Sequence, residues 1–213
     1  MTEQQIPKLV AALVEHQSAF APLPTDDAQW VIQNTKKAIE ICIKAIKNRP
    51  KLAKPLLDQI GTVEVPATAE PFIAVEKFVI GTDREAKVKI SYLGANFTEW
   101  FSDKVEDHFG GSTLRYRKLR KESVDGPIIT ELGGGDAAET TLAELFKTLE
   151  MQPNGERGNL LINGWANVFY IKDKNGVLRA VICHWNGDGW RVDADPVGDP
   201  DGWNDGRQFF SRN

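Results

Sequence analysis

The chain contains few of the residues that most often bind metals, form cross-links or carry out catalysis. Its 213 residues include two cysteines, Cys42 and Cys183, and three histidines, His16, His108 and His184. The cysteines are too far apart for a CxxC motif, and no HExxH, P-loop or GxSxG pattern occurs. We therefore expect no metal ion, no cofactor and no catalytic residue.

Long apolar runs and a large net charge are also lacking. No run approaches the roughly 18 apolar residues of a membrane-spanning helix. The N-terminus lacks the basic and then apolar pattern of an export signal. We therefore expect a soluble, cytoplasmic protein with reduced thiols and no membrane partner. The formal net charge of −4 is too small to indicate a general attraction to nucleic acid or to any other polyion.

The composition is that of a globular protein, with 41% apolar and 26% charged residues. The spacing of apolar residues has a period of 3.6 up to Gly61 and a period of two from Phe72 onwards. This change predicts a helical N-terminal segment over 1–61, a proline-containing linker over 62–71 and a second domain over 72–213. The predicted class is α+β, with an antiparallel β-sheet that carries two packed helices.

Three helices are expected in the N-terminal segment. The first covers 2–17, the second begins at Thr25 and ends before Pro50, and the third covers 52–60. The second helix has an apolar stripe that we expect to be buried, and it also carries four lysines. Its stripe consists of Ala28, Val31, Ile32, Ala38, Ile39, Cys42, Ala45 and Ile46. Because helices of this size are marginally stable alone, we expect them to pack on the rest of the chain or on a partner.

In the second domain, we predict a hairpin of 72–80 with 86–93 and a helix capped by Asn96. A basic strand over 113–121 and a helix over 136–150, capped by Asp136 and Glu139, follow. Asn175-Gly176 predicts a type I′ turn joining two strands within 159–185. The remaining predicted strands are 190–194 and an edge strand at 208–210.

The stretch 183–206 contains three tryptophans and six aspartates among glycines and prolines. The flat rings of Trp185, Trp190 and Trp203, with Asp193 and His184 as polar neighbours, are typical of a ligand-binding site. The alternative is a cross-strand pair of Trp185 and Trp190 beside a turn. The aspartates at 193–205 lack the EF-hand spacing, which favours turns over a calcium site without deciding the question.

Two further patterns suggest other functions. His184 with Asp193 and neighbouring aspartates is the basis for a hydrolase hypothesis. Five cations within 115–121 suggest nucleic-acid binding through Arg115, Arg117 and Arg120. Alternation along a strand, however, divides these cations between its two faces. A charged edge strand has the same composition and is the alternative interpretation. The G-x-G-x-x-A sequence at 133–138 lacks the βαβ context of a dinucleotide site.

The sequence thus favours a soluble, non-catalytic binding or interaction module that uses its Trp- and Asp-rich C-terminal region. The partner is a protein or a small-molecule ligand that the sequence does not specify. A hydrolase-type enzyme using His184 and a nucleic-acid binder using the basic strand are the two alternatives.

Overall fold

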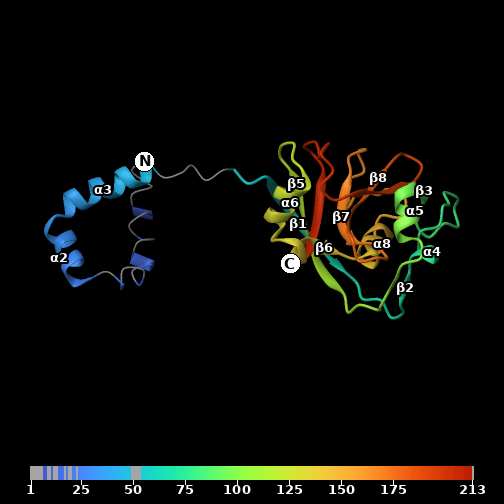
Figure 1. Ribbon diagram of the computed structural model, residues 1–213, viewed down its shortest axis with the longest axis horizontal. Helices are drawn as coiled ribbons and strands as arrows, with labels where there is room; N and C mark the ends of the chain where they lie inside the picture. The colour runs from blue at the N-terminus through green and yellow to red at the C-terminus, as the bar shows by residue number, and fades with distance from the viewer. Residues whose placement is uncertain are drawn as a thin grey trace. The chain divides into compact units, whose positions relative to one another are not determined.

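The computed structural model describes residues 7–8, 11, 14–16, 18, 21–22, 24–48 and 54–212 (Figure 1). Contacts divide the chain into two compact units, residues 1–53 and residues 54–213, and we call the latter the sheet unit. The first predicted helix falls largely outside the described residues. No helix within the described part of the chain is long and apolar enough to cross a membrane.

In the N-terminal unit, the single helix predicted from Thr25 is two helices, α2 (Thr25–Gln33) and α3 (Thr35–Asn48). They are separated at Asn34, whose backbone N–H and Nδ2 both donate to the carbonyl of Trp30. Short polar side chains that bind nearby carbonyls in this way compete with helix continuation. Thr25 makes no capping hydrogen bond. The expected burial of the apolar stripe is not found within this unit, where none of the described residues 24–45 is buried.

The sheet unit is an α+β fold built on one eight-stranded sheet, which confirms the predicted class. The sheet is mixed rather than antiparallel, since β10 and β6 both run parallel to β7, and β3 runs parallel to β9. Along the sheet the order is β1 (Leu57–Val65), β5 (Ser112–Leu119), β10 (Gln208–Arg212), β7 (Asn167–Lys172), β8 (Leu178–Trp185), β9 (Trp190–Pro196) and β3 (Ile90–Leu93), and β6 (Glu139–Thr140) also pairs with β7.

The last strand of the chain, β10, lies inside the sheet between β5 and β7. The prediction of an edge strand at 208–210 is therefore wrong. Phe209 and Phe210 point to opposite faces, and both are fully buried. A strand whose two faces are both buried has consecutive apolar residues in place of an alternating pattern, and such strands lie in the interior of a sheet.

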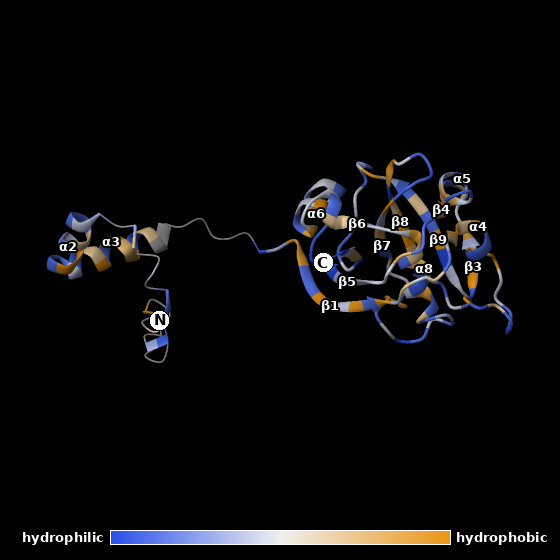
Figure 2. Ribbon diagram, turned by 90° about the horizontal axis from the view of Figure 1, so that it is seen from below, coloured by the Kyte–Doolittle hydropathy of each residue, from blue (hydrophilic) through white to orange (hydrophobic). Residues whose placement is uncertain are grey.

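Helices cover both faces of the sheet, and a hydrophobic core lies on each (Figure 2). On the first face, which we call the α8 face, lie the helices α4 (Ala74–Lys77), α5 (Ala95–Phe101) and α8 (Leu142–Glu150). On the second, the α6 face, lie α6 (Asp125–Leu132), α7 (Gly135–Ala138) and the loop that carries Trp203. The sheet unit therefore contains five helices where the sequence predicts two.

The third predicted helix is wrong, because its residues lead into strand β1. A β-bulge at Ile60 interrupts the pairing of this strand with β5. The extra residue reverses the alternation, so that Leu57 belongs to the core of the α6 face and Val63 to the core of the α8 face. At the bulge, a Cβ atom on Gly61 would lie 2.5 Å from the Tyr116 hydroxyl oxygen, so any larger residue would have to displace the Tyr116 side chain.

The hairpin predicted for 72–80 and 86–93 is also wrong. A short strand, β2 (Phe72–Ile73), pairs with β4 (Val105–Glu106). The second predicted strand has only a bridge from Ile90 to Gly81, which lies in the predicted turn. The segment is held instead by an aromatic cluster, in which Phe78 lies 5.2 Å from Phe146 between ring centroids. Tertiary packing thus overrides a local strand pattern here.

The hairpin of β7 and β8 is confirmed, although its turn differs from the predicted one. Gly176 has a φ of 80°, and no non-glycine residue in the described chain has a positive φ. A type I′ turn would also need a positive φ at Asn175. The backbone N–H of Gly176 donates to Asp173, and that of Asp173 donates to Val177, which is the pattern of a type I turn followed by a glycine bulge.

Candidate functional site

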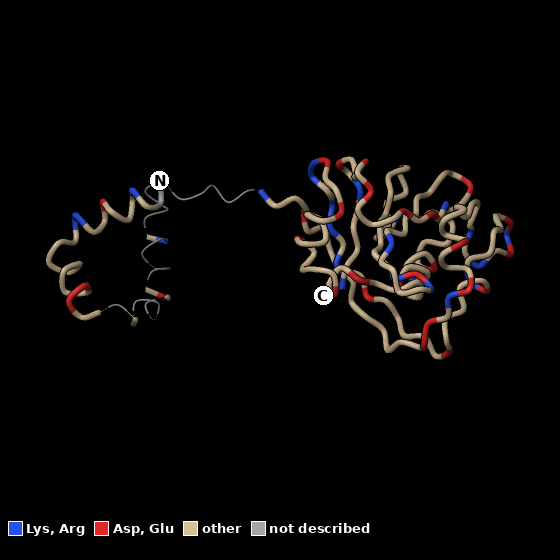
Figure 3. Tube along the Cα trace, in the orientation of Figure 1, with Lys and Arg blue, Asp and Glu red and all other residues tan. Residues whose placement is uncertain are grey.

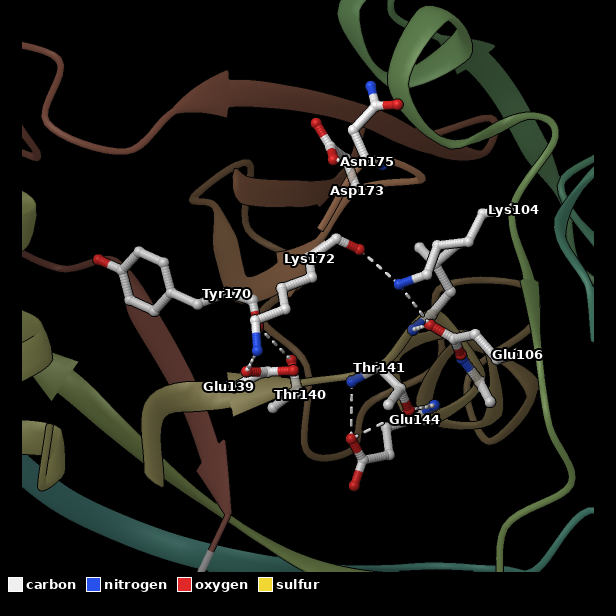
Figure 4. Close-up of polar contacts among 12 residues, drawn as sticks. Lys104, Glu106, Glu139, Thr140, Thr141, Glu144, Tyr170, Lys172, Asp173 and Asn175 are labelled. Atoms are coloured by element: carbon white, nitrogen blue, oxygen red, sulfur yellow. Dashed lines mark hydrogen bonds and ion pairs between the residues drawn. The ribbon is translucent and has the colours of Figure 1, made fainter. Parts of the chain in front are cut away.

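The N-terminal end of α8 is surrounded by a closed polar network (Figure 4). Thr141 caps the helix, and Glu144 completes a capping box by accepting the N–H of Thr141 at 2.7 Å. The fully buried Glu144 carboxylate also accepts from Ser112 Oγ at 2.6 Å and from Arg212 Nε at 3.1 Å. The predicted capping pair of Asp136 and Glu139 is therefore wrong.

A second carboxylate reaches the same helix end from strand β4. The two oxygens of Glu106 accept the N–H groups of Leu142 and Ala143 at 3.0 and 2.9 Å. Lys104 pairs with Glu106 at 2.9 Å and also donates to the carbonyl of Lys172 (Figure 4). Because each of these groups has its partner inside the protein, we interpret this network as structural support for α8.

On the opposite face of the sheet, the buried carboxylate of Asp125 joins three segments that are distant in sequence. Its Oδ1 accepts from the Tyr170 hydroxyl at 2.7 Å and from Trp203 Nε1 at 2.6 Å, and its Oδ2 accepts from the N–H of Gly198 at 2.8 Å. Burial, and then the charge of Asp125, raise the pKa of Tyr170, so its hydroxyl stays a donor. Trp203 is thus a core residue that anchors its loop.

The other two predicted ligand-binding tryptophans lie on the α8 face. Trp190 is fully buried, and its Nε1 donates to the carbonyl of Gln152 at 3.0 Å. Trp185 packs edge-on against Trp190 with 5.5 Å between ring centroids. A Cβ atom on Gly155 would lie 2.2 Å from the Trp185 ring, so the backbone at Gly155 covers that ring. The pair is therefore the cross-strand pair of the alternative interpretation.

The structure does not bring the three tryptophans together, because Trp203 lies across the sheet from Trp185 and Trp190. Trp190 and Trp203 are buried, so Trp185 is the only one of the three rings that is partly exposed. In the folded protein, no open surface combines the three rings.

His184 and Asp193, by contrast, do lie on the same face. His184 pairs across β8 and β9 with Arg191, and Asp193 is two residues further along β9. No hydrogen bond joins His184 to Asp193 in the described chain; Asp193 Oδ1 accepts instead from the N–H of Ala194 at 2.8 Å. Burial and then the positive charge of Arg191 lower the pKa of His184, against an opposing effect of Asp193.

The aspartates of the C-terminal loops do not converge into one cluster of side chains. Within the described residues, no three His, Cys, Asp or Glu side chains converge in a way that would hold an ion. Asp199 Oδ1 accepts from the N–H of Asp201 at 2.9 Å, which is an Asx-type turn contact. Burial, followed by the charges of Asp193, Asp199 and Asp125, raises the pKa of Asp195.

The basic strand β5 is an inner strand, so its interpretation as a charged edge is wrong. Basic and acidic residues are interspersed over the sheet unit (Figure 3). In the register of β5 with β1, Lys118 lies opposite Asp58, whereas Arg115 and Arg117 lie opposite Thr62 and Gln59. Arg117 donates to Gln59 and to the carbonyl of Glu131, both at 3.0 Å, and Arg120 pairs with Asp58 at 3.2 Å. Two of the three predicted nucleic-acid-binding arginines therefore already have partners within the protein, and the third, Arg115, lies on the same face as Arg117.

A feature that sequence reasoning missed lies next to His184 on the α6 face. Arg191 pairs with His184 on one side and with Tyr92 of β3 on the other. Its guanidinium carbon lies 4.2 Å from the centre of the Tyr92 ring, and 39% of Tyr92 is exposed. We call these three residues, Tyr92, Arg191 and His184, the Arg191 row.

Arg191 differs from the other stacked arginine of the sheet. Arg179 lies 3.9 Å from the centre of the Trp100 ring, but its Nε also pairs with Asp173 at 3.0 Å. Among the residues described, Arg191 has neither a carboxylate within ion-pair distance nor a hydrogen-bond acceptor. The pairing of strands β3 and β9 creates this arrangement, and no motif in the sequence indicates it.

Two grooves of the sheet unit lie elsewhere. They have volumes of about 210 and 380 Å³, and they share Lys77, Lys87 and Phe146 among their lining residues. Neither contains a residue that the sequence suggests for a site. Lys87 and Lys147 both pair with Glu150 at 2.7 Å, so their charges are compensated locally.

No protein-family model, no curated protein and no solved structure matches this chain. Functional inference therefore rests on the geometry of these residues.

Proposed function

We propose that this protein is a non-catalytic binding module whose sheet unit holds a small ligand by one anionic group at the Arg191 row. The observation that carries the proposal is the unpaired guanidinium of Arg191, oriented by the Tyr92 ring at 4.2 Å. Stacking holds the plane of a guanidinium while its N–H groups, which lie in that plane, stay available. These donors match a carboxylate or a phosphate group.

The neighbouring charges support a small ligand rather than a polyanion. Asp193 lies two residues from Arg191 on the same face, and Asp195 follows it. A continuous phosphate backbone would run past these carboxylates and be repelled by them. A single carboxylate or phosphate group would meet Arg191 and His184 alone, and its negative charge would favour the protonated form of His184.

Two observations favour binding over catalysis. A general base is oriented by a hydrogen bond to a third group such as a carboxylate. Within the part of the chain that the structure describes, His184 makes no such hydrogen bond. Cys183, the adjacent thiol, points to the opposite face and is fully buried, and burial raises its pKa. A thiol kept neutral in this way is a poor nucleophile.

The test is a titration of the full chain with sulfate and with acetate, followed by NMR of the backbone and arginine N–H groups. We expect saturable shifts at Tyr92, His184 and Arg191, and about tenfold weaker binding in Arg191→Ala, because a charge-assisted contact is lost. Arg191→Lys should retain part of the affinity. Arg120→Ala, which removes a cation paired with Asp58, is the matched control and should bind like the wild type.

Sulfate keeps its charge near neutral pH, so its binding should strengthen as His184 takes up a proton. Shifts of equal size in Arg191→Ala and the wild type would contradict the proposal. Binding of a single-stranded oligonucleotide that depends on Arg115 would favour the nucleic-acid alternative instead.

A further inference from the structure

Helix α3 is amphipathic, and its apolar side is exposed. At 100° per residue, the apolar residues of 35–45 fall on one side of the helix and the charged residues on the other. No described residue of the N-terminal unit buries this side: the exposed fractions are 53% for Ile39, 53% for Ile41 and 45% for Ile43. The apolar side consists of Ala38, Ile39, Ile41, Cys42, Ile43 and Ala45.

The opposite side of the helix carries mostly positive charge. Three lysines, Lys36, Lys37 and Lys44, share it with a single acidic residue, Glu40 (Figure 3). Over 35–54 the sequence has seven basic residues and one acidic residue, although the whole chain has a net charge of −4. Positive charge is therefore concentrated in the segment that also exposes isoleucines.

The width of the apolar side indicates what covers it. The six residues span about 200° of the helix, whereas the seam of a two-stranded coiled coil is a narrow stripe. A broad apolar side opposite lysines is typical of helices that lie in the interface of a membrane with anionic lipids. Trp30 of α2 is 41% exposed and lies beside Lys37, and tryptophan favours the same interface.

We propose that α3 binds the surface of an anionic membrane, with Ile39, Ile41 and Ile43 in the lipid and the lysines among the headgroups. Its 14 residues would extend about 21 Å, less than the roughly 30 Å of a hydrocarbon core, so the helix lies in the plane of the membrane. The absence of a long apolar run, which led us to expect no membrane partner, concerns helices that span a bilayer. Surface binding needs no such run.

The experiment is sedimentation of the full chain with vesicles of phosphatidylcholine alone and of phosphatidylcholine mixed with phosphatidylserine. We expect sedimentation with the mixed vesicles, reversed by high salt because headgroup attraction is screened. Ile41→Glu should weaken binding by on the order of tenfold or more, since it removes apolar area from the lipid. Ile80→Glu replaces an isoleucine of the sheet unit that is 60% exposed, and it should bind like the wild type.

A second variant separates loss of binding from loss of the helix. Replacing Lys36, Lys37 and Lys44 by glutamine keeps good helix formers and the apolar side, and it should abolish the preference for phosphatidylserine. Wild-type protein that stays in solution with both vesicle types would overturn the proposal. A dimer of the free protein that Ile41→Glu dissociates, without any vesicle binding, would overturn it in favour of a second copy of the chain. Neither result depends on the Arg191 row.

Discussion

The two faces of the sheet each contain a buried carboxylate, and the two are stabilised in different ways. On the α8 face, Glu144 accepts from a capping threonine, a serine and the guanidinium of Arg212. On the α6 face, Asp125 accepts from three neutral donors, and no cation lies within ion-pair distance of it in the described chain. Either carboxylate is costly to remove, because its donors would stay buried without partners.

The contrast lies in the exposure of the donors that each carboxylate binds. Both carboxylates reach distant segments, since Ser112 and Arg212 lie 32 and 68 residues from Glu144 and Tyr170 and Trp203 lie 45 and 78 residues from Asp125. The Arg212 side chain is 42% exposed, whereas Tyr170 and Trp203 are both buried. We therefore expect Asp125 to matter more for the whole sheet unit than Glu144.

The largest effect is expected for Asp125→Ala. It leaves the Tyr170 hydroxyl, the Trp203 indole and the Gly198 N–H without their acceptor, and the free energy of unfolding should fall by about 3–5 kcal/mol. Urea denaturation followed by tryptophan fluorescence measures this loss. Asp188→Ala, at an exposed position, should change the midpoint little. Equal midpoints for the two variants would refute the structural role of Asp125.

A smaller loss, about 2–3 kcal/mol, is expected for Glu144→Ala. It removes the capping box and the charged acceptor of Ser112, but Arg212 is 42% exposed at its side chain and would be rehydrated. Arg212→Ala should cost less than Glu144→Ala for the same reason. Denaturation midpoints of the two variants test this order, and a more damaging Arg212→Ala would contradict the role of Glu144 as the main acceptor of this network.

Gly61→Val tests the bulge that lets strand β1 contribute to both cores. The added side chain would meet the Tyr116 ring, and we expect a loss of about 1–3 kcal/mol in the free energy of unfolding. Ile60→Val, at the neighbouring exposed position, is the control and should have little effect. A valine at 61 that is tolerated as well as one at 60 would show that Tyr116 has room to move.

The smallest effect concerns His184 and pH. Its folded-state pKa lies below its usual value of 6.5, because burial and then Arg191 disfavour the charged imidazole. As the pH falls below 6.5, His184 is protonated in the unfolded chain before it is protonated in the folded protein. The free energy of unfolding therefore decreases with decreasing pH. Urea midpoints from neutral pH to about pH 5 should fall less in His184→Gln than in the wild type. Parallel curves would show that His184 titrates alike in both states.

Several elements of the sheet unit could be predicted because their signals are local. The hairpin of β7 and β8 has two apolar strands on either side of Asn175-Gly176, and β9 follows with clear alternation. The start of α8 was misplaced even so. The actual capping box, Thr141 and Glu144, has the same spacing as the predicted pair of Asp136 and Glu139. Pairing of β6 with β7 decides between them, and that contact is not local.

The candidate site could be predicted only in part. His184 and Asp193 were expected to share a face because they lie on adjacent strands. Tyr92 could not be connected with them, since a parallel pairing of β3 with β9 joins residues about a hundred positions apart. The polar neighbours of the three tryptophans suggested a ligand-binding site. Trp190 and Trp203 are buried because Gln152 and Asp125, distant in sequence, accept from their indoles.

By itself, the sequence determined the α+β class and the separation of apolar and basic residues on α3. These follow from periodicity and turn chemistry within a few residues. Only the tertiary structure decided that β10 is an inner strand, that two of the three tryptophans of 183–206 are core residues and that Arg191 has no acidic partner among the described residues. Each of these depends on which distant segments pair, and hydrophobic burial on both faces of the sheet selects that pairing.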